Sequence, residues 1–276
     1  MEANPNGAEL APGERIDDLL RNNLRIIQSS EVFSFSMDAV LLAHFCSAPA
    51  KGRIMDLCTG NGVVPLLLTA RTKARLWGIE LQERLAAMAE RSVRLNGLEE
   101  RVRVAQMDLK EAHLAYGYGG FDLVTVNPPY LPVRVGEQNG NPHFAAARHE
   151  IHCTLEDVVA AASRLVKAGG KVAMVHRPSR LADILLLFRQ YRLEPKRLRF
   201  VHPRAGGEAN MVLIEAIRDG RPELRLLPPL IVYQEDGSYC PELLKVYYEP
   251  LTAEDGSVEL REEGASEGAN EGRTAR

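Results

Sequence analysis

The sequence lacks the features that mark membrane-spanning, secreted and disulfide-rich proteins. None of the apolar runs in its 276 residues is long enough to cross a bilayer. The first 13 residues lack the basic-then-apolar order of a signal peptide. The four cysteines, Cys46, Cys58, Cys153 and Cys240, form no C-x-x-C pair, so we expect reduced thiols rather than disulfides. These absences predict a cytoplasmic protein that has no membrane partner.

A strong net charge and a clear metal-binding cluster are also missing. The formal net charge is -3, of which residues 251–276 contribute -4, so the rest of the chain carries +1. That balance does not by itself indicate a nucleic-acid partner. His149, His152 and Cys153 are close in sequence, but no second group of ligands accompanies them. We therefore expect no metal.

From Arg53 onward, strand patterns alternate with helix patterns, which is typical of a parallel α/β sheet. The expected strands are Arg53–Leu57, Arg75–Ile79, Val102–Gln106, Phe121–Val126, Lys171–His176, Arg197–Val201 and Met211–Ile217, the last two as an antiparallel hairpin at the sheet edge. The expected helices are Val63–Arg71, Gln82–Asn96, Thr154–Lys167 and Ser179–Tyr191. The pattern predicts a mostly parallel, seven-stranded sheet flanked by helices.

The segments on either side of this region predict the remaining organisation. We expect a disordered N-terminus (1–13), an N-terminal extension (14–50), the α/β core (51–220), a docked C-terminal extension (221–250) and a disordered acidic tail (251–276). Within the N-terminal extension, Val32–Ser36 alternates like a strand. Ser36 is then placed to cap a helix that runs from Met37 to about Cys46.

The stretch Val124–Tyr130 ends a β-branched run in Asn-Pro-Pro-Tyr. Two prolines cannot continue a sheet ladder, so the strand stops at Asn127 and a stiff turn follows. In open α/β sheets, ligands bind at the carboxyl ends of the strands. The Asn127 amide, the Pro128 carbonyl and the Tyr130 ring therefore predict a site for a planar substrate that bears an amino group.

A glycine-containing turn, Asp56–Gly62, follows the first core strand and opens a helix. Gly60 and Gly62 permit close approach of the backbone to a ligand. The dinucleotide fingerprint G-x-G-x-x-G/A fails here because Pro65 occupies its third small position. Binding of a pyrophosphate-containing dinucleotide is therefore the alternative rather than the main prediction.

Acidic residues stand at the ends of the first three core strands. Glu80 is placed to accept hydrogen bonds from ribose hydroxyls, Asp108 from an adenine amine, and Asp56 from a water or an ammonium group. No Lys or Arg accompanies them to neutralise phosphates. The set favours a nucleoside without phosphates that carries an amino acid.

These motifs together resemble class I S-adenosylmethionine methyltransferases. Asp56–Gly62 is similar to their D/E-x-G-x-G-x-G first motif, except that Cys58 stands in place of the first glycine. Asn127–Tyr130 resembles the motif of enzymes that methylate adenine N6, cytosine N4, guanine N2 or a glutamine amide. The resemblance covers residues 30–217 and implies a Rossmann-like class I methyltransferase fold with S-adenosylmethionine as cofactor, held by Asp56, Cys58, Gly60, Gly62, Glu80, Asp108 and Asn127.

A narrower resemblance is to the bacterial valine tRNA (adenine-N6) methyltransferases. It is carried by Asp17–Leu20, Leu24–Ser29, Phe33–Leu42, Pro228–Tyr233 and Tyr247–Tyr248. This resemblance implies a tRNA partner and methylation of the adenine just 3′ of the anticodon. We expect the enzyme to be a monomer.

In such an enzyme, the catalytic residues are expected to be Asn127, Pro128 and Tyr130. The Asn127 side-chain oxygen and the Pro128 carbonyl would accept the two protons of the substrate amine, and Tyr130 would stack on the base. Replacing Tyr130 by phenylalanine is then expected to do little. Phe35 and Asp38 are candidates for a roof over the methionyl part of the cofactor. The loop 131–150 and the basic segment 196–204 are candidates for contacts with RNA.

Other readings of the sequence remain open. A protein glutamine methyltransferase of the release-factor type shares the Asn-Pro-Pro-Tyr motif, but such enzymes carry a longer helical N-terminal domain than this chain has. Other rRNA or DNA amino-methyltransferases also share the motif. A non-catalytic cofactor-binding module is a third class, which the presence of both Asn127 and Tyr130 disfavours.

Overall fold

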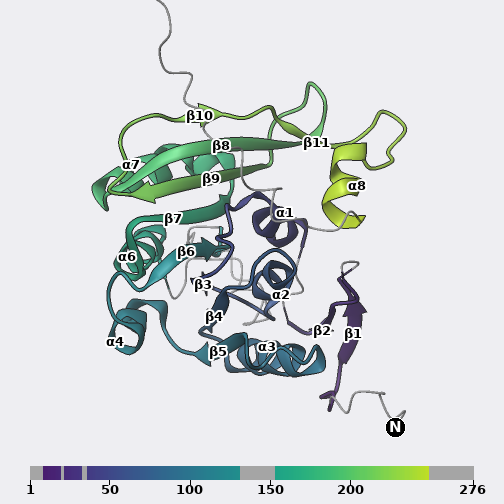
Figure 1. Ribbon diagram of the computed structural model, residues 1–276. Coiled ribbons are helices and arrows are strands. Elements are labelled where there is room, and N and C mark those ends of the chain that lie inside the picture. Colours follow the sequence, from purple (N-terminus) through teal and green to yellow (C-terminus); the bar gives the residue numbers. More distant parts are fainter. Residues whose placement is uncertain (1–8, 20–21, 33–35, 131–152, 249–276) are drawn as a thin grey trace, which may run out of the picture.

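One mostly parallel sheet with helices on both faces forms the centre of the fold. The computed structural model describes residues 9–19, 22–32, 36–130 and 153–248. In this part of the chain the strand order is β10-β8-β9-β7-β6-β3-β4-β5, and β11 also pairs with β8 (Figure 1). The core strands are β3 (Arg53–Leu57), β4 (Arg75–Glu80), β5 (Val102–Gln106), β6 (Phe121–Val126), β7 (Val166–His176), β8 (Leu193–Arg204) and β9 (Met211–Arg218).

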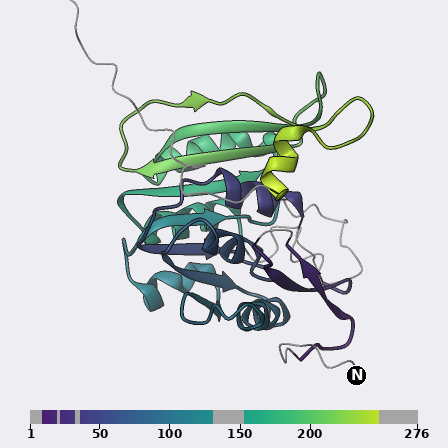
Figure 2. The same ribbon diagram turned by 45° about the vertical axis from the view of Figure 1, so that its right-hand side comes forward.

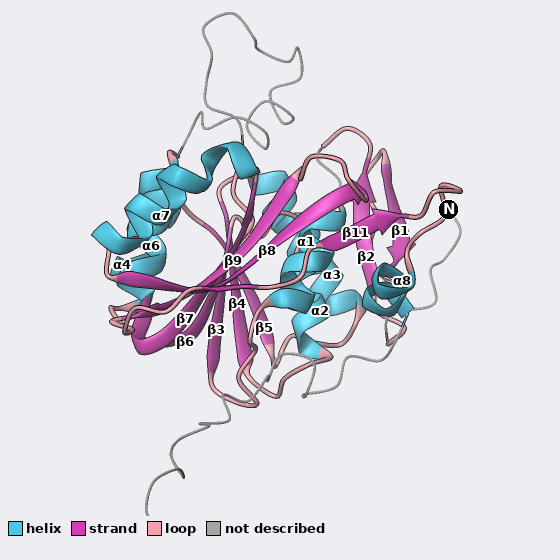
Figure 3. Cartoon of the chain, turned by 90° about the horizontal axis from the view of Figure 1, so that it is seen from above, coloured by secondary structure: helices cyan, strands magenta, loops and turns pink. Residues whose placement is uncertain are grey.

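The helices form two layers, one on each face of the sheet (Figure 3). One layer holds α1 (Met37–Phe45), α2 (Val63–Thr69) and α3 (Glu83–Leu95). The other holds α4 (Ala112–Tyr116), α6 (Leu155–Leu165) and α7 (Leu181–Gln190). Because both faces are covered, the central strands β3 and β6 are buried almost throughout. No helix in the described part of the chain is long and apolar enough to span a membrane.

Local sequence signals explain most of the element ends. β3, β5 and β6 have the predicted bounds. Each of the four helices predicted in the core is present, with ends that differ from the prediction by only a few residues. Thr154 caps α6 as predicted, because its side chain accepts from the Asp157 backbone N–H while the Asp157 carboxylate accepts from the Thr154 N–H. β7 begins at Val166, earlier than predicted, and its pairing with β6 contains a register shift.

The N-terminal extension contains a hairpin that the sequence did not predict. β1 (Glu14–Asp18) and β2 (Arg25–Ser29) pair antiparallel, and β2 packs beside α3. α1 follows with the predicted bounds to within one residue. Residues 33–35 of the strand predicted at Val32–Ser36 lie outside the described residues, and Val32 belongs to no strand.

The prediction that the last two core strands form the edge of the sheet is wrong. β8 and β9 are an antiparallel pair as expected, but β8 also pairs with β10 (Arg225–Leu226) and β11 (Leu230–Tyr233). The described sheet therefore has nine strands rather than seven. Figure 2 shows these strands and α8 (Pro241–Tyr248) beside β8 and α1.

Candidate functional site

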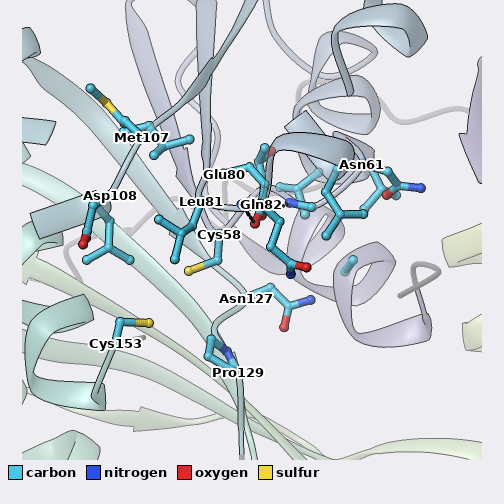
Figure 4. A pocket seen from close by; sticks show the side chains of 18 residues that line it. Cys58, Asn61, Glu80, Leu81, Gln82, Met107, Asp108, Asn127, Pro129 and Cys153 are labelled. Carbon is cyan, nitrogen blue, oxygen red and sulfur yellow. Dashed lines mark hydrogen bonds between the residues drawn. The ribbon is translucent and has the colours of Figure 1, made fainter. Parts of the chain in front are cut away.

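A cavity opens at the carboxyl ends of β3, β4, β5 and β6, where an open α/β sheet binds its ligands. Its volume of about 960 Å³ includes the solvent at its open mouth. Of the predicted cofactor residues, five line it: Cys58, Gly60, Glu80, Asp108 and Asn127. Figure 4 shows four of these side chains around the cavity, Gly60 having none.

Glu80 is the carboxylate at the end of β4, and it is held in place by the backbone. One oxygen accepts from the Gly60 N–H at 2.9 Å, and the other accepts from the Gln82 N–H at 3.0 Å. Burial raises the pKa of Glu80, while the N–H groups of Gln82 and Gly60 act in the opposite direction. Each carboxylate oxygen keeps a further lone pair, which suits two hydroxyl donors on a ligand.

The glycine turn has the left-handed backbone that its motif requires. Gly60 and Gly62 have φ of +58° and +90°, and Cys58 has φ of +57°. A residue with a side chain is strained there by about 1–2 kcal/mol. Cys58 therefore keeps the backbone conformation that a glycine would adopt and adds a thiol to the cavity wall, facing Cys153 (Figure 4). Gly62 does not line the cavity. A side chain there would meet Ala89 of α3 at 3.2 Å.

Asp56 does not line the cavity, which differs from its predicted contact with a ligand. Its carboxylate is buried and accepts hydrogen bonds from the Thr59 and Thr125 hydroxyls, each at 2.6 Å. Thr59 belongs to the glycine turn and Thr125 to β6. Asp56 thus holds the turn against the sheet, and both its oxygens are occupied by the protein.

Asp108 lines the cavity at the end of β5, as predicted. It begins a short 3-10 helix, since its side chain accepts from the Lys110 backbone N–H at 2.9 Å. The Lys110 ammonium lies 3.3 Å from the second oxygen. Met107 and Leu109 flank Asp108, and Leu81 faces them from the turn after β4 with 40% of its surface exposed. These side chains form an apolar slot beside a carboxylate.

The Asn-Pro-Pro-Tyr turn reaches the same cavity from β6. Asn127 and Pro129 line it, whereas Pro128 and Tyr130 do not. The Tyr130 hydroxyl lies 2.5 Å from Asn127 Oδ1 and also contacts Asp38 Oδ2. Burial and the Asp38 carboxylate raise the pKa of Tyr130 well above its usual value, so the phenol keeps its proton.

The Tyr130 ring is half-buried and packs against protein side chains, and it does not line the described cavity. It meets His176 of β7 edge to face at a centroid distance of 5.2 Å, and the Arg177 guanidinium lies 5.9 Å from its centroid. Burial lowers the pKa of His176 to about 4, so this imidazole is neutral at physiological pH. Asp38 at the start of α1 is likewise engaged by protein groups and does not line the cavity, while Phe35 lies outside the described residues.

Several residues of the site carried no distinct signal in the sequence. Ala39, Asn61 and Gln82 line the cavity, and the Asn61 side chain donates to the Ile27 carbonyl at 3.1 Å, which ties the glycine turn to β2. Cys153 lines it from the segment before α6. Partners far away in the chain bring these side chains to the cavity, so their spacing in sequence is uninformative.

The basic segment 196–204 is largely committed to contacts within the protein. Arg197 pairs with Glu215 at 3.1 Å, and Arg199 pairs with Glu242. These two side chains are therefore not a free basic edge for RNA. The loop 131–150 lies outside the described residues, as do His149 and His152. Among the residues that the structure describes, no group of three or more His, Cys, Asp or Glu could hold a metal.

The composition of the cavity decides between the two predicted cofactor types. None of the described lining residues is Lys or Arg. The Gly60 N–H, which would face a pyrophosphate in a dinucleotide site, donates to Glu80 instead. A carboxylate for the ribose, an apolar slot and a second carboxylate fit a nucleoside without phosphates.

Comparisons with known proteins agree with this geometry. The sequence profile of the methyltransferase small domain matches residues 23–139. A tRNA1(Val) (adenine(37)-N6)-methyltransferase from Aeromonas salmonicida is 31% identical over 180 residues, 64% of this chain and 73% of that protein. One from Porphyromonas gingivalis is 29% identical over 219 residues, 76% of this chain and 85% of that protein. The solved structure of a predicted O-methyltransferase from Agrobacterium tumefaciens has a TM-score of 0.62 at 26% identity, covering 76% of this chain and 95% of its own.

The fold and the cavity therefore define a Rossmann-like class I methyltransferase, an enzyme that uses S-adenosylmethionine. The same observations exclude the two alternatives, a dinucleotide-binding protein and a non-catalytic cofactor-binding module. Within that class, the chain belongs to the tRNA1(Val) (adenine(37)-N6)-methyltransferase family.

Replacing Glu80 by alanine is expected to weaken binding of S-adenosylmethionine by about 1.5–3 kcal/mol, the scale of hydrogen bonds to a charged group. The loss includes the support that Glu80 gives to Gly60 and Gln82. Calorimetric titration measures the change. Glu90→Ala, on the exposed face of α3, is the matched control and should bind as the wild type does. Equal affinity of the Glu80 variant and the control would remove Glu80 from the site.

The buried Asp56 predicts a pH dependence of stability. Burial raises its pKa in the folded state from 3.8 to about 7. The folded state therefore binds more protons than the unfolded state between these pH values, and the free energy of unfolding falls as pH rises through that window. Asp56→Asn removes this ionisation, so the fall should shrink by a few kcal/mol. Chemical denaturation at pH 4.5 and 7.5 measures it, with the exposed Asp183→Asn as control. If the free energy of unfolding of Asp56→Asn fell with pH as steeply as that of the wild type, Asp56 would not be the source of the pH dependence.

Proposed function

We propose that the protein transfers a methyl group to the N6 amine of an adenine in tRNA, the adenine just 3′ of the anticodon in a valine tRNA. The observation that carries the proposal is the Asn127 side chain at the edge of the cavity, presented by the rigid turn at the end of β6. It lines the same cavity as Glu80, Cys58 and Asp108. Membership of the family supports the choice of adenine and of tRNA.

The amino group of adenine is a poor nucleophile because its lone pair is delocalised into the ring. Acceptors aimed at its two hydrogens localise that lone pair as the nitrogen becomes tetrahedral. Asn127 Oδ1 and the Pro128 carbonyl are the proposed acceptors. Most of the rate should come from holding the amine in position. When bound, S-adenosylmethionine supplies a methyl group on a positively charged sulfur, so a strong general base is not required.

The residues proposed to hold the cofactor divide into two sets. Glu80, Asp108 and Gly60 face the cavity and are proposed to contact the nucleoside, beside the apolar slot of Leu81 and Met107. Asp56, Gly62 and Asp38 act from outside the cavity lining and are proposed to shape it. Tyr130 is proposed to border the substrate base rather than the cofactor.

The target base must leave its stack to reach such a turn. An anticodon-loop base is already largely unpaired, which lowers the cost of presenting its amine to a pocket. We propose that the enzyme acts on tRNA as a monomer in the cytoplasm. The core of residues 51–220 would carry catalysis, while β10 and β11 of the C-terminal extension widen the sheet and α8 packs against α1 and β11.

Labelled methyl transfer to total tRNA from cells that lack this protein tests the proposal. We expect label in a valine tRNA, recovered as N6-methyladenosine after digestion, and none in tRNA from cells that contain the enzyme. If tRNA stayed unlabelled and a glutamine of a release factor became labelled, the proposal would be overturned and the protein would be a glutamine methyltransferase. Light scattering measures the mass of the active enzyme and tests whether it is a monomer.

A further inference from the structure

The Tyr130 hydroxyl is the centre of a short chain of polar contacts. It contacts Asp38 Oδ2 on one side and lies 2.5 Å from Asn127 Oδ1 on the other. A phenol has one proton, and both of these oxygens are acceptors. Only one of the two contacts can therefore receive that proton. Since the oxygen and nitrogen of an amide have nearly the same shape, the orientation of Asn127 has to be assigned from its hydrogen bonds.

Asp38 is built to be the acceptor. Its Oδ1 accepts from the Ser36 hydroxyl at 2.6 Å and from the Ala39 N–H at 2.8 Å. Its side chain belongs to a residue only 6% exposed, at the start of α1. Oδ2 is left facing the Tyr130 hydroxyl. A buried carboxylate takes the proton of a neighbouring phenol more strongly than a neutral amide oxygen does.

Once Tyr130 donates to Asp38, its oxygen offers Asn127 only lone pairs. Asn127 then satisfies the 2.5 Å contact by turning its NH2 group toward Tyr130. That rotation moves the amide oxygen away from Tyr130, on a side chain that lines the cavity. If Tyr130 instead donated to Asn127, the amide oxygen would be occupied by the tyrosine proton. The NH2 group of Asn127 would then face the amine of the substrate, and two donors cannot form a hydrogen bond.

We propose that Asp38 and the Tyr130 hydroxyl are positioning residues that set the direction of the Asn127 amide, so that its oxygen is free to accept from the substrate amine. This inference rests on the proposed function. It assigns Asp38 to the substrate side of the site, rather than to a roof over the cofactor, and it replaces the expectation that Tyr130 needs only its ring.

Two nearly isosteric variants test the chain. Tyr130→Phe removes the link and leaves Asn127 unguided, so kcat should fall about tenfold, the effect of losing one hydrogen bond near 1.4 kcal/mol. Asp38→Asn offers Tyr130 an NH2 group, which reverses the chain and blocks the amide oxygen. Its kcat should fall at least as far. In both variants, affinity for S-adenosylmethionine should stay close to wild type, while the melting temperature of Tyr130→Phe should fall, because the buried Asp38 Oδ2 loses its donor.

The double variant gives the sharpest readout. The amide introduced at position 38 acts on Asn127 only through the Tyr130 hydroxyl. Asp38→Asn/Tyr130→Phe should therefore have the kcat of Tyr130→Phe alone, which would be a partial rescue of Asp38→Asn. Tyr191→Phe is the matched control, because its hydroxyl also donates to a carboxylate, Glu156 at 2.8 Å, and neither residue lines the cavity. It should keep wild-type kcat.

Wild-type kcat in both single variants, or losses that simply add in the double variant, would overturn the chain. A fall in cofactor affinity that matches the fall in kcat would do the same, since it would return Asp38 to the cofactor. These outcomes differ from the result expected if the proposed function is wrong, because the wild-type enzyme itself would then leave tRNA unmethylated.

Discussion

Asn127→Ala is expected to reduce the rate of methyl transfer to tRNA by about 10²–10³, the loss seen when one preorganised group that stabilises a transition state is removed. The amide is proposed to act mainly as the amine nitrogen changes geometry, so kcat should fall while affinity for S-adenosylmethionine stays nearly intact. Single-turnover transfer of labelled methyl, together with calorimetric titration of the cofactor, separates the two quantities.

The control for this prediction is Asn210→Ala, an exposed asparagine between β8 and β9. It removes the same side chain from a residue that does not line the cavity and should leave both quantities unchanged. An Asn127→Ala enzyme that turns over at the wild-type rate would contradict the mechanism. Equal losses of cofactor affinity and of rate would instead place Asn127 among the cofactor contacts alone.

The sequence predicted those parts of the fold whose signals are local. The core strand β3 lies between turn residues, and α3 has a clear apolar face ended by Gly97, so both could be located from spacing alone. The hairpin of β1 and β2 and the two short strands β10 and β11 could not. Their pairing partners are chosen by the finished sheet, and they lie outside the regular alternation of strands and helices that marked β3.

The same distinction applies to the site. Glu80 and Asp108 reach the cavity because the carboxyl ends of neighbouring parallel strands meet at one edge, a rule that applies before the structure is known. The roles of Asp56 and Tyr130 depend instead on partners far away in the chain. Asp56 meets Thr125, and Tyr130 meets Asp38, 92 residues earlier. The sequence identified these side chains as important, but it could not give the atoms that they contact.

Glu215→Ala is expected to produce the largest loss of stability of the changes considered. Glu215 lies on β9 with 2% of its surface exposed. Its carboxylate accepts from the Ser47 N–H at 2.6 Å, from the Ser47 hydroxyl at 2.9 Å and from Arg197 at 3.1 Å. Arg197 also donates to the Phe45 carbonyl at the end of α1, at 2.8 Å. The group thus ties the helix that carries Asp38 to the antiparallel part of the sheet.

Removing the Glu215 carboxylate leaves Arg197 partly buried without its counter-charge and takes away the acceptor that Glu215 gives to the Ser47 N–H and hydroxyl. Such a loss costs about 3–5 kcal/mol. Urea denaturation of the full chain measures it. The matched control is Glu242→Ala, which breaks the ion pair of Arg199 with a glutamate side chain that is 53% exposed, and should cost less than about 1 kcal/mol. Glu215→Gln keeps an acceptor for Ser47 and should fall between the two. If Glu215→Ala were no less stable than Glu242→Ala, the network would not be what holds α1 to β9.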